Sequence, residues 1–468
     1  MAVVDSSDSI TSPWRQDMRQ LVALTLPILC TQICQSGLSL VDTIMAGQVS
    51  ARDLAGVAIG AGVWLPVFLL LVGVLLSTTP LIGEVIGQKH ANQHHQVRFI
   101  TQQSLWLALV LGVIGVSAVN QLYRLFGVMG VPSEIAPIAR EFLRGISLGL
   151  PAVCAYTSLR CYTESLKQPV VVTVISLIGL LLNIPLNYLF IHGIAIGDRQ
   201  ILPALGGAGC GYASAATLWL NLIMLGGYLS LTPRQAFSQT RFYQQFAAAK
   251  LSQLGKQLRL GIPIGLSVFF EVSAFSLAAL IISPLGEIAV ASHQVAITVS
   301  SQLFMLPFSL ATALTILVSN RYGAQDFVAL RRMAWLGLAV ATALALGGMT
   351  IIALLREQIP AWFSHDPAVI AKSATLLWFA MLYQIVDAWQ VNFAGILRGV
   401  QDTTVPMVIT LISYWLVAIP LGWYLTRHTA LGASGFWLAL VTGLSVAALL
   451  LGLRTWRQQR ILRQAWAA

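Results

Sequence analysis

Long apolar runs separated by short polar breaks are the feature that most constrains how this chain folds. Each run is long enough to cross a membrane as a helix, which takes about 20 residues. The runs cover residues 18–46, 54–80, 96–119, 135–158, 168–192, 207–231, 259–283, 289–318, 332–355, 369–396, 405–426 and 432–454. Only 9% of the residues are charged, whereas soluble chains carry about 25%. We therefore predict an all-α polytopic membrane protein with twelve transmembrane helices.

The two halves of the chain resemble each other. Short segments of the first half recur in the same order in the second half, at a nearly constant offset. The matching pairs are GEVIGQ (83–88) with SNRYGA (319–324), VTVIS (172–176) with ITLIS (409–413), NIPLNY (183–188) with AIPLGW (418–423), and Pro27 with Pro263. Both halves begin on the same side of the membrane, so the repeat is parallel, and we predict two six-helix halves with a cavity between or within them.

The longest polar interruption separates these halves. We predict an N-terminal lobe at 1–231, a cytoplasmic linker at 232–258, and a C-terminal lobe with a cytoplasmic tail at 259–468. Most of the 27 Lys and Arg residues lie in segments on the same side of the spans as the N-terminus. The positive-inside rule then places both termini in the cytoplasm. The cations are scattered and form no basic stripe, so we expect no nucleic-acid partner.

Three acidic residues lie inside apolar runs: Asp42, Glu271 and Asp387. A carboxylate in hydrocarbon costs several kcal/mol, so each must face a cavity, hold a proton or bind a cation. Glu271 and Asp387 lie eleven or twelve residues from an arginine at the inner end of their spans, which is roughly 17 Å and near the midplane. Together with Tyr383, one turn before Asp387, they predict a cation site. The alternative is a buried carboxylic acid that is hydrogen-bonded to a neighbouring helix.

A second polar group is predicted in the first half. Asn183 and Asn187 share one helix face, and Asp42 lies toward the outer leaflet. Amide oxygens with a carboxylate suit Na⁺ or a proton-linked hydrogen-bond network. Thr217, four residues after Ala213, is a further candidate. The alternative role of these side chains is to hydrogen-bond helices together.

Motifs of other functional classes are missing from the sequence. It contains no GxxxxGK[ST] phosphate loop, nucleophile elbow or zinc motif, and its five cysteines show no disulfide or metal spacing. We therefore expect no covalent cofactor, no ATP-driven transport within the chain and no enzymatic activity.

Several segments resemble the multidrug and toxic compound extrusion (MATE) family, in particular its NorM-like bacterial branch. They are LTLPILCTQICQSGLSLVDTIMAG (24–47), NIPLNY (183–188), LGGAGCGYASA (205–215), IPIGLSVFFEVSAF (262–275) and GILRGVQDTTVP (395–406). The resemblance covers essentially the whole chain. It implies two six-helix lobes around a central cleft, and export of bulky, mainly cationic drugs and dyes in exchange for Na⁺ or H⁺. It also implies a bacterial inner-membrane location, and we expect a monomer surrounded by lipid.

The resemblance also assigns roles to residues. The acidic pair that binds the coupling cation matches Glu271 and Asp387, with Tyr383 beside them. The acidic residue of the first lobe matches Asp42, and its polar pair matches Asn183 and Asn187. Some relatives have aspartate where this chain has Asn187, which argues against a proton relay of that kind in this lobe and leaves a Na⁺ role open.

Three other functions are alternatives for a polytopic chain of this kind. A lipid-linked glycan flippase of the wider superfamily carries an anionic substrate and should have Arg or Lys in its cavity. No such cation is evident within the spans, which argues against this alternative. A polytopic membrane enzyme should have its acids or histidines clustered at one membrane face, whereas the acids here lie inside the spans. A channel would show continuous single-channel conductance.

Overall fold

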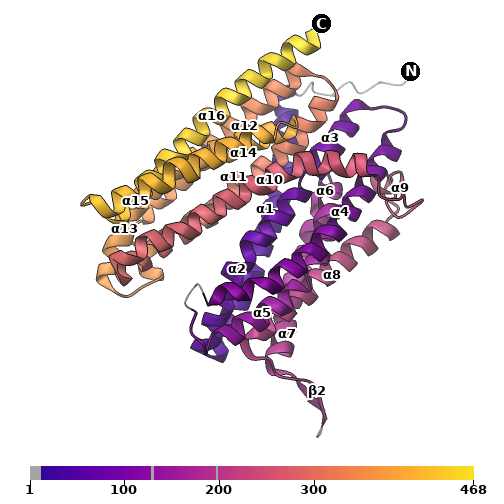
Figure 1. The fold of residues 1–468 in the computed structure, drawn as a ribbon. Helices are drawn as coiled ribbons and strands as arrows, with labels where there is room; N and C mark the ends of the chain where they lie inside the picture. Colours follow the sequence, from indigo (N-terminus) through magenta and orange to yellow (C-terminus); the bar gives the residue numbers. More distant parts are fainter. Residues whose placement is uncertain (1–11, 128–130, 197–198, 468) are drawn as a thin grey trace, which may run out of the picture.

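The computed structural model describes residues 12–127, 131–196 and 199–467 and consists mainly of long helices (Figure 1). The elements of the first half are α1 (Pro13–Val49), α2 (Ala51–Leu75), α3 (Thr78–Gln88), α4 (Gln93–Leu122), η1 (Tyr123–Phe126), α5 (Ala136–Ser147), α6 (Leu150–Ser165), α7 (Pro169–His192), β1 (Ile194–Ile196), β2 (Arg199–Leu202), η2 (Gly206–Ala208) and α8 (Gly209–Leu231). The short helix α9 (Gln235–Ser238) follows. The elements of the second half are α10 (Leu251–Ile282), η3 (Ser283–Leu285), α11 (Glu287–Gly323), α12 (Phe327–Leu355), η4 (Ile359–Trp362), α13 (Pro367–Gly399), α14 (Thr404–Leu411), η5 (Ile412–Ala418), α15 (Ile419–His428) and α16 (Ala433–Ala467).

The predicted twelve spans are found in the described part of the chain. Eleven helical segments are long and apolar enough to cross a membrane, and α5 and α6 together make a twelfth that is bent by 44°. Pro151 lies in the first turn of α6 and has no amide hydrogen to donate, which allows the bend. The described strands β1 and β2 form a short antiparallel hairpin between α7 and α8, where only a loop was expected.

The start of α1 and the end of α16 lie at the same end of the molecule (Figure 1). Asp17, near the start of α1, forms ion pairs with Arg321 of α11 at 2.6 Å and with Arg332 of α12 at 2.5 Å. The ring of Trp466, near the end of α16, lies 5.8 Å from that of Tyr322 on α11. A chain that crosses the membrane an even number of times has both termini on the same side, which agrees with this position of α1 and α16.

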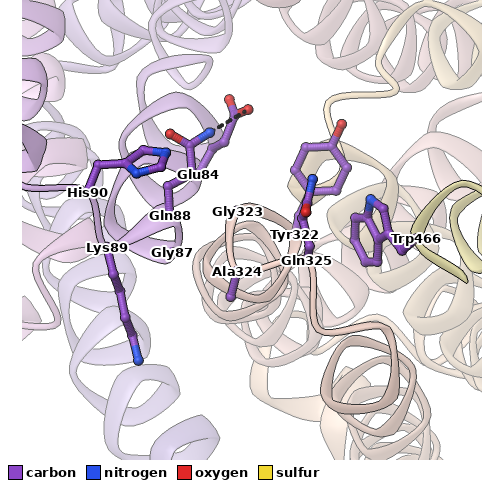
Figure 2. Close-up of a pocket in the computed structure, with 10 residues that line it drawn as sticks. All are labelled: Glu84, Gly87, Gln88, Lys89, His90, Tyr322, Gly323, Ala324, Gln325 and Trp466. Carbon is purple, nitrogen blue, oxygen red and sulfur yellow. Dashed lines mark hydrogen bonds between the residues drawn. The ribbon is translucent and has the colours of Figure 1, made fainter. Parts of the chain in front are cut away.

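The two halves touch at this end and spread apart toward the other (Figure 1). Helix α2 packs on α10, and α3 packs on α11. Small residues allow the contact, because a Cβ added to Gly73 would lie 2.6 Å from the Cα of Gly265, and one added to Gly87 would clash with Asn320. Figure 2 shows the same contact at Gly323, where α3 and α11 border a cavity of about 480 Å³.

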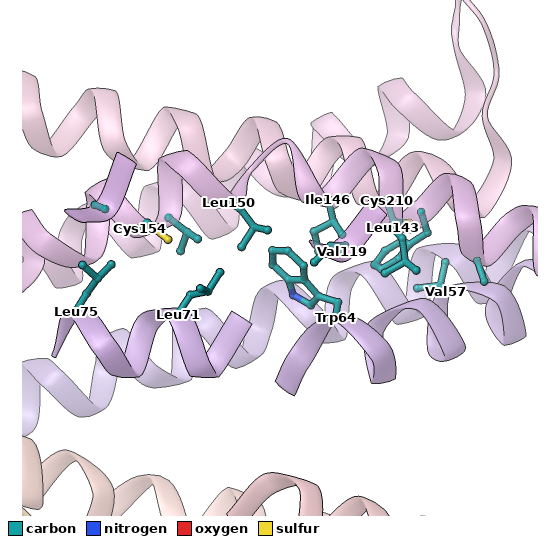
Figure 3. Packing of buried hydrophobic residues seen from close by; sticks show 14 of the residues in the cluster. Val57, Trp64, Leu71, Leu75, Val119, Leu143, Ile146, Leu150, Cys154 and Cys210 are labelled. Carbon is teal, nitrogen blue, oxygen red and sulfur yellow. The ribbon is translucent and has the colours of Figure 1, made fainter. Parts of the chain in front are cut away.

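Each half has an apolar interior of its own. In the first half, Trp64 and Leu71 of α2 pack against Leu143 of α5 and Leu150 of α6 (Figure 3). A corresponding cluster in the second half surrounds Trp437 of α16. These interiors hold the helices of each half at fixed positions, so that polar side chains inside a half are presented at defined places.

The segment that connects the halves is bound to the first half of α4. The side-chain amide of Gln103 donates to the Ala248 carbonyl at 2.9 Å, and the Trp106 indole donates to Ala247 at 3.1 Å. Helix α10 begins at Leu251, so the last part of the predicted linker is helical. Gln257, in the second turn of α10, is buried and donates to the Ile100 carbonyl at 3.1 Å, which holds the polar start of this helix against α4.

Candidate functional site

The structure brings two acidic side chains together inside the second half. Glu271 lies on α10 and Asp387 on α13, and these helices meet where the ring of Phe275, one turn after Glu271, contacts that of Tyr383, one turn before Asp387. Tyr383 lies one turn before Asp387, and both are buried, with 4% and 1% of their surface exposed. Within the described residues, neither carboxylate oxygen of Asp387 has a hydrogen-bond partner. Among the described residues, the donor group that acts on this buried acid is the hydroxyl of Tyr383.

Tyr414, which no sequence pattern singled out, completes this group. Its hydroxyl donates to Glu271 at 3.3 Å. It lies in η5, a stretch of π-helix, and such turns often mark functional sites. The ring of Phe275, one turn beyond Glu271, contacts Tyr383 and Tyr414 edge-on at 6.2 and 6.1 Å between ring centres. Tyr414 follows the repeated ITLIS segment directly, but local spacing alone cannot place it beside α10.

The polar residues predicted in the first half form a second, connected group. The Asn187 amide donates to Asp42 at 2.8 Å and to the Asn183 side-chain oxygen at 2.9 Å. The Asn183 amide in turn donates to the Thr217 hydroxyl at 3.3 Å. Side chains of α1, α7 and α8 are therefore joined in one hydrogen-bond network, and all of them are buried.

Ser214 is a member of this network that the sequence prediction missed. Its hydroxyl donates to the second carboxylate oxygen of Asp42 at 2.5 Å. It lies three residues before Thr217 on α8, a spacing that places both on the same helix face, so this signal was present in the sequence. Both oxygens of Asp42 are thus hydrogen-bonded, whereas the side-chain oxygen of Asn187 is buried without a partner among the described residues.

Two arginines line a cavity between the halves, which corrects the expectation that no cation faces the cleft. The cavity has a volume of about 90 Å³, and its walls include Gln32, Phe68 and Arg160 from the first half and Phe308 and Arg398 from the second. Both arginines lie near the ends of their helices, where the sequence assigned them to the membrane edge. Both arginines face the inside of the protein because residues of both halves surround them where the halves are in contact.

Comparison with known proteins gives consistent results. The family model MatE matches residues 27–189 and 263–424, one segment in each half. The chain is 47% identical to the probable multidrug resistance protein NorM of Acinetobacter baylyi, covering 96% of this chain and 98% of the relative. It is 38% identical to the multidrug resistance protein PmpM of Pseudomonas aeruginosa, with 96% and 94% covered. It is 36% identical to the multidrug resistance protein NorM of Vibrio cholerae, with 96% and 97% covered.

Solved structures share the fold. An outward-facing multidrug resistance MATE family transporter superposes with a TM-score of 0.84 at 21% identity, covering 95% of this chain and 96% of that one. The eukaryotic MATE transporter AtDTX14 gives a TM-score of 0.84 at 19% identity, with 97% and 100% covered. At these identities the likeness concerns the arrangement of the helices.

Proposed function

The chain belongs to the MatE family, and on that premise we propose that it exports bulky, mainly cationic drugs and dyes across the bacterial inner membrane in exchange for Na⁺ or H⁺. The protein is a multi-pass membrane transporter and not an enzyme. We place both termini in the cytoplasm and expect a monomer in the lipid bilayer. The relatives named above are multidrug resistance proteins, which supports drugs as the substrate class.

The buried carboxylate of Asp387, which has few donors around it, is the observation that carries the coupling proposal. A buried charge without a partner costs several kcal/mol. Binding a proton or Na⁺ removes that cost, and Glu271 supplies a second carboxylate beside it. The hydroxyls of Tyr383 and Tyr414 offer further oxygens. Oxygen ligands of this kind suit Na⁺, and two neighbouring acids suit a shared proton.

The first-half group has a different role in this proposal. Both oxygens of Asp42 already accept a hydrogen bond, from the Asn187 amide and the Ser214 hydroxyl, so this acid depends less on a cation for compensation of its charge. The free side-chain oxygen of Asn187 offers one ligand for Na⁺. We propose that this group responds to the state of the transporter, and that Glu271 and Asp387 hold the coupling cation.

Alternating access follows from two states that bind cation and drug unequally. With the termini in the cytoplasm, the spread ends of the halves face outward (Figure 1). Cation entry from outside then favours release of the drug and the return to an inward-facing state. One charge moving through 100 mV yields about 2.3 kcal/mol, which sustains a gradient of about fiftyfold for a neutral substrate. A cationic drug exchanged one-for-one cancels the voltage contribution.

Dye export from proteoliposomes tests the proposal. An inward Na⁺ gradient is imposed at clamped voltage without a pH gradient, and an inward proton gradient is imposed in a parallel sample. Export driven by either gradient, and lost in Glu271→Gln and Asp387→Asn, identifies the coupling ion. Full gradient-driven export by both variants would exclude the acidic pair, and silence of the wild type under both gradients would favour the flippase alternative.

A further inference from the structure

A large basic cavity lies between the end of α4 and the start of α5 in the first half. It has a volume of about 1010 Å³ and lies at the end of the molecule where the halves spread apart (Figure 1). Phe142 of α5 packs against Gly60 of α2, which is the helix that contacts α10 of the second half. Arg140 and Arg144, two residues to either side of Phe142, therefore lie on the opposite face of α5. The cavity that they line thus faces away from the second half.

The wall of this cavity carries more positive charge than it balances. Its charged residues are one acid, Glu141, and three arginines, Arg124, Arg140 and Arg144, which leave a net charge of three minus one, or +2. Glu141 accepts a hydrogen bond from the Tyr212 hydroxyl at 2.6 Å and lies 3.9 Å from Arg144. Among the residues that the structure describes, Arg124 and Arg140 have no ion-pair partner. The positive-inside rule does not predict such a cluster at this end, where the Lys and Arg residues are in the minority.

The guanidinium groups of this cavity have donors available for an oxyanion. Arg140 lies over the ring of Tyr123, 4.1 Å from the ring centre. A guanidinium that stacks on a ring keeps its N–H donors, which lie in its own plane, free for a ligand. Guanidinium groups bind phosphate through paired charge-assisted hydrogen bonds, and a phosphate has enough oxygens to engage more than one of them. The cluster therefore suits a ligand that carries a phosphate.

Exposed apolar side chains continue from the cavity toward the middle of the membrane. On α4, Val113 lies seven residues before Asn120 of the cavity wall, and on α5 the helix-end residue Leu148 lies four residues after Arg144. Each therefore shares a helix face with a residue of the cavity. Both are about half exposed, at 55% for Val113 and 50% for Leu148. A phosphate site at the membrane surface with apolar surface deeper in the membrane matches the headgroup and acyl chains of a phospholipid.

We propose that this cavity binds the phosphate of an anionic phospholipid, whose acyl chains lie along Val113 and Leu148. Pockets of about 300 to 1,000 Å³ hold drug-sized ligands, so a cavity of about 1010 Å³ has room for the headgroup. With the termini placed in the cytoplasm, the lipid belongs to the outer leaflet. The site is separate from the coupling residues and from the contact between the halves, so it adds a lipid partner to the proposed function. Inorganic phosphate offers the same headgroup chemistry without the chains.

Native mass spectrometry of the full chain in detergent tests the lipid site. Phosphatidylglycerol and phosphatidylcholine with the same acyl chains are titrated, and the affinity of the first bound lipid is measured. Arg124→Gln combined with Arg140→Gln should weaken phosphatidylglycerol about tenfold or more, because hydrogen bonds to a charged group are lost, and should change phosphatidylcholine by less than about twofold. Both arginines are exposed, so this variant should melt like the wild type in lipid-free detergent. The control combines Arg356→Gln with Arg427→Gln, two arginines that each stack on a tryptophan at the same end of the second half, and should bind both lipids like the wild type.

A second variant separates a lipid from free phosphate. Val113→Gln combined with Leu148→Gln leaves the arginines in place and should weaken phosphatidylglycerol about fivefold, because apolar contacts with the acyl chains are lost. Excess inorganic phosphate should leave phosphatidylglycerol bound to the wild type. Displacement by inorganic phosphate, together with wild-type affinity in the Val113 and Leu148 variant, would assign the cavity to a free anion and overturn the lipid proposal.

Two further results would also overturn the lipid site. One is undiminished phosphatidylglycerol binding in the variant that lacks Arg124 and Arg140. The other is an equal loss in the Arg356 and Arg427 control, which would trace the binding to general surface charge. The measurement requires no transport, so its outcome does not depend on whether the coupling proposal holds.

Discussion

The acids of the two halves differ in what surrounds them. Both oxygens of Asp42 accept hydrogen bonds, from Asn187 at 2.8 Å and from Ser214 at 2.5 Å. The oxygens of Asp387 accept none from the residues that the structure describes, and its neighbour Glu271 carries the same charge. An acid with several donors in place needs a cation less than one with few donors. This contrast is the reason why we propose cation binding in the second half.

The hydrogen bonds around Asp42 predict a stability effect at the residue scale. Ser214→Ala removes one donor and leaves a buried carboxylate oxygen unpaired, which should cost about 1 to 3 kcal/mol. The variant should melt at a lower temperature than the wild type in detergent. Ser276→Ala is the control, because that serine is exposed and bonds only its own helix. If both variants melted at the same temperature, the hydrogen bond from Ser214 to Asp42 would not stabilise the protein.

At the scale of the helices, the contact between α2 and α10 depends on glycine. Gly265 lies against the backbone of α2, where an added Cβ would come within 2.6 Å of the Leu70 carbonyl oxygen. A backbone neighbour cannot move aside as a flexible side chain can. A larger residue at this position must therefore push the two helices apart, and with them the halves at the end where they now touch.

Gly265→Val should shift the protein toward a state in which the opposite ends of the halves are closer. Double electron–electron resonance between spin labels at Ala51→Cys and Ser283→Cys, in a background lacking the exposed Cys30, should show a new population at shorter distance. Gly255→Val on the same helix is the control, because a Cβ there meets nothing within 4 Å. Identical distance distributions for the two variants would rule out the glycine contact as a determinant of the state.

Over the whole molecule, Asp17 links the halves where they meet. Its ion pairs with Arg321 and Arg332 join α1 to α11 and α12, and Asp17 is only 4% exposed. The exposed pair between Arg52 and Glu134 lies within the first half and is 2.8 Å long. Removing one partner of a buried ion pair costs about 3 to 5 kcal/mol, because the other charge is left unpaired, whereas exposed pairs contribute a median of about 0 to 1 kcal/mol.

Asp17→Asn should open the end of the molecule at which the halves touch. The loss of two charge-assisted bonds, about 1.5 to 3 kcal/mol each, should raise the reaction rate of a maleimide with Asn320→Cys, a buried position in this contact, by roughly tenfold or more. The same reporter cysteine in a Glu134→Gln background should react at the unmodified rate. An unchanged rate in Asp17→Asn would show that other contacts hold this end closed.

The sequence predicted the spans well because hydropathy depends on composition alone. Each predicted run lies within a helical segment or within a few residues of one, including the bent pair α5 and α6.

The buried acids were also visible in the sequence, because charges are rare inside apolar runs. Side-chain surroundings were not visible: Tyr414 reaches Glu271 from a helix far along the chain. That Arg160 and Arg398 line a cavity was also not visible in the sequence, because it depends on how the two halves pack against each other.

Cation binding to the purified protein tests the central claim most directly. Sodium binding is followed with radioactive ²²Na⁺, and proton release with a pH-indicator dye, in the wild type, in Asp387→Asn and in Asp42→Asn. The account predicts that Asp387→Asn loses the cation signal and still binds transported dye, while Asp42→Asn retains the cation signal. Wild-type cation binding in Asp387→Asn, or its loss only in Asp42→Asn, would contradict the assignment of the coupling site to the second half.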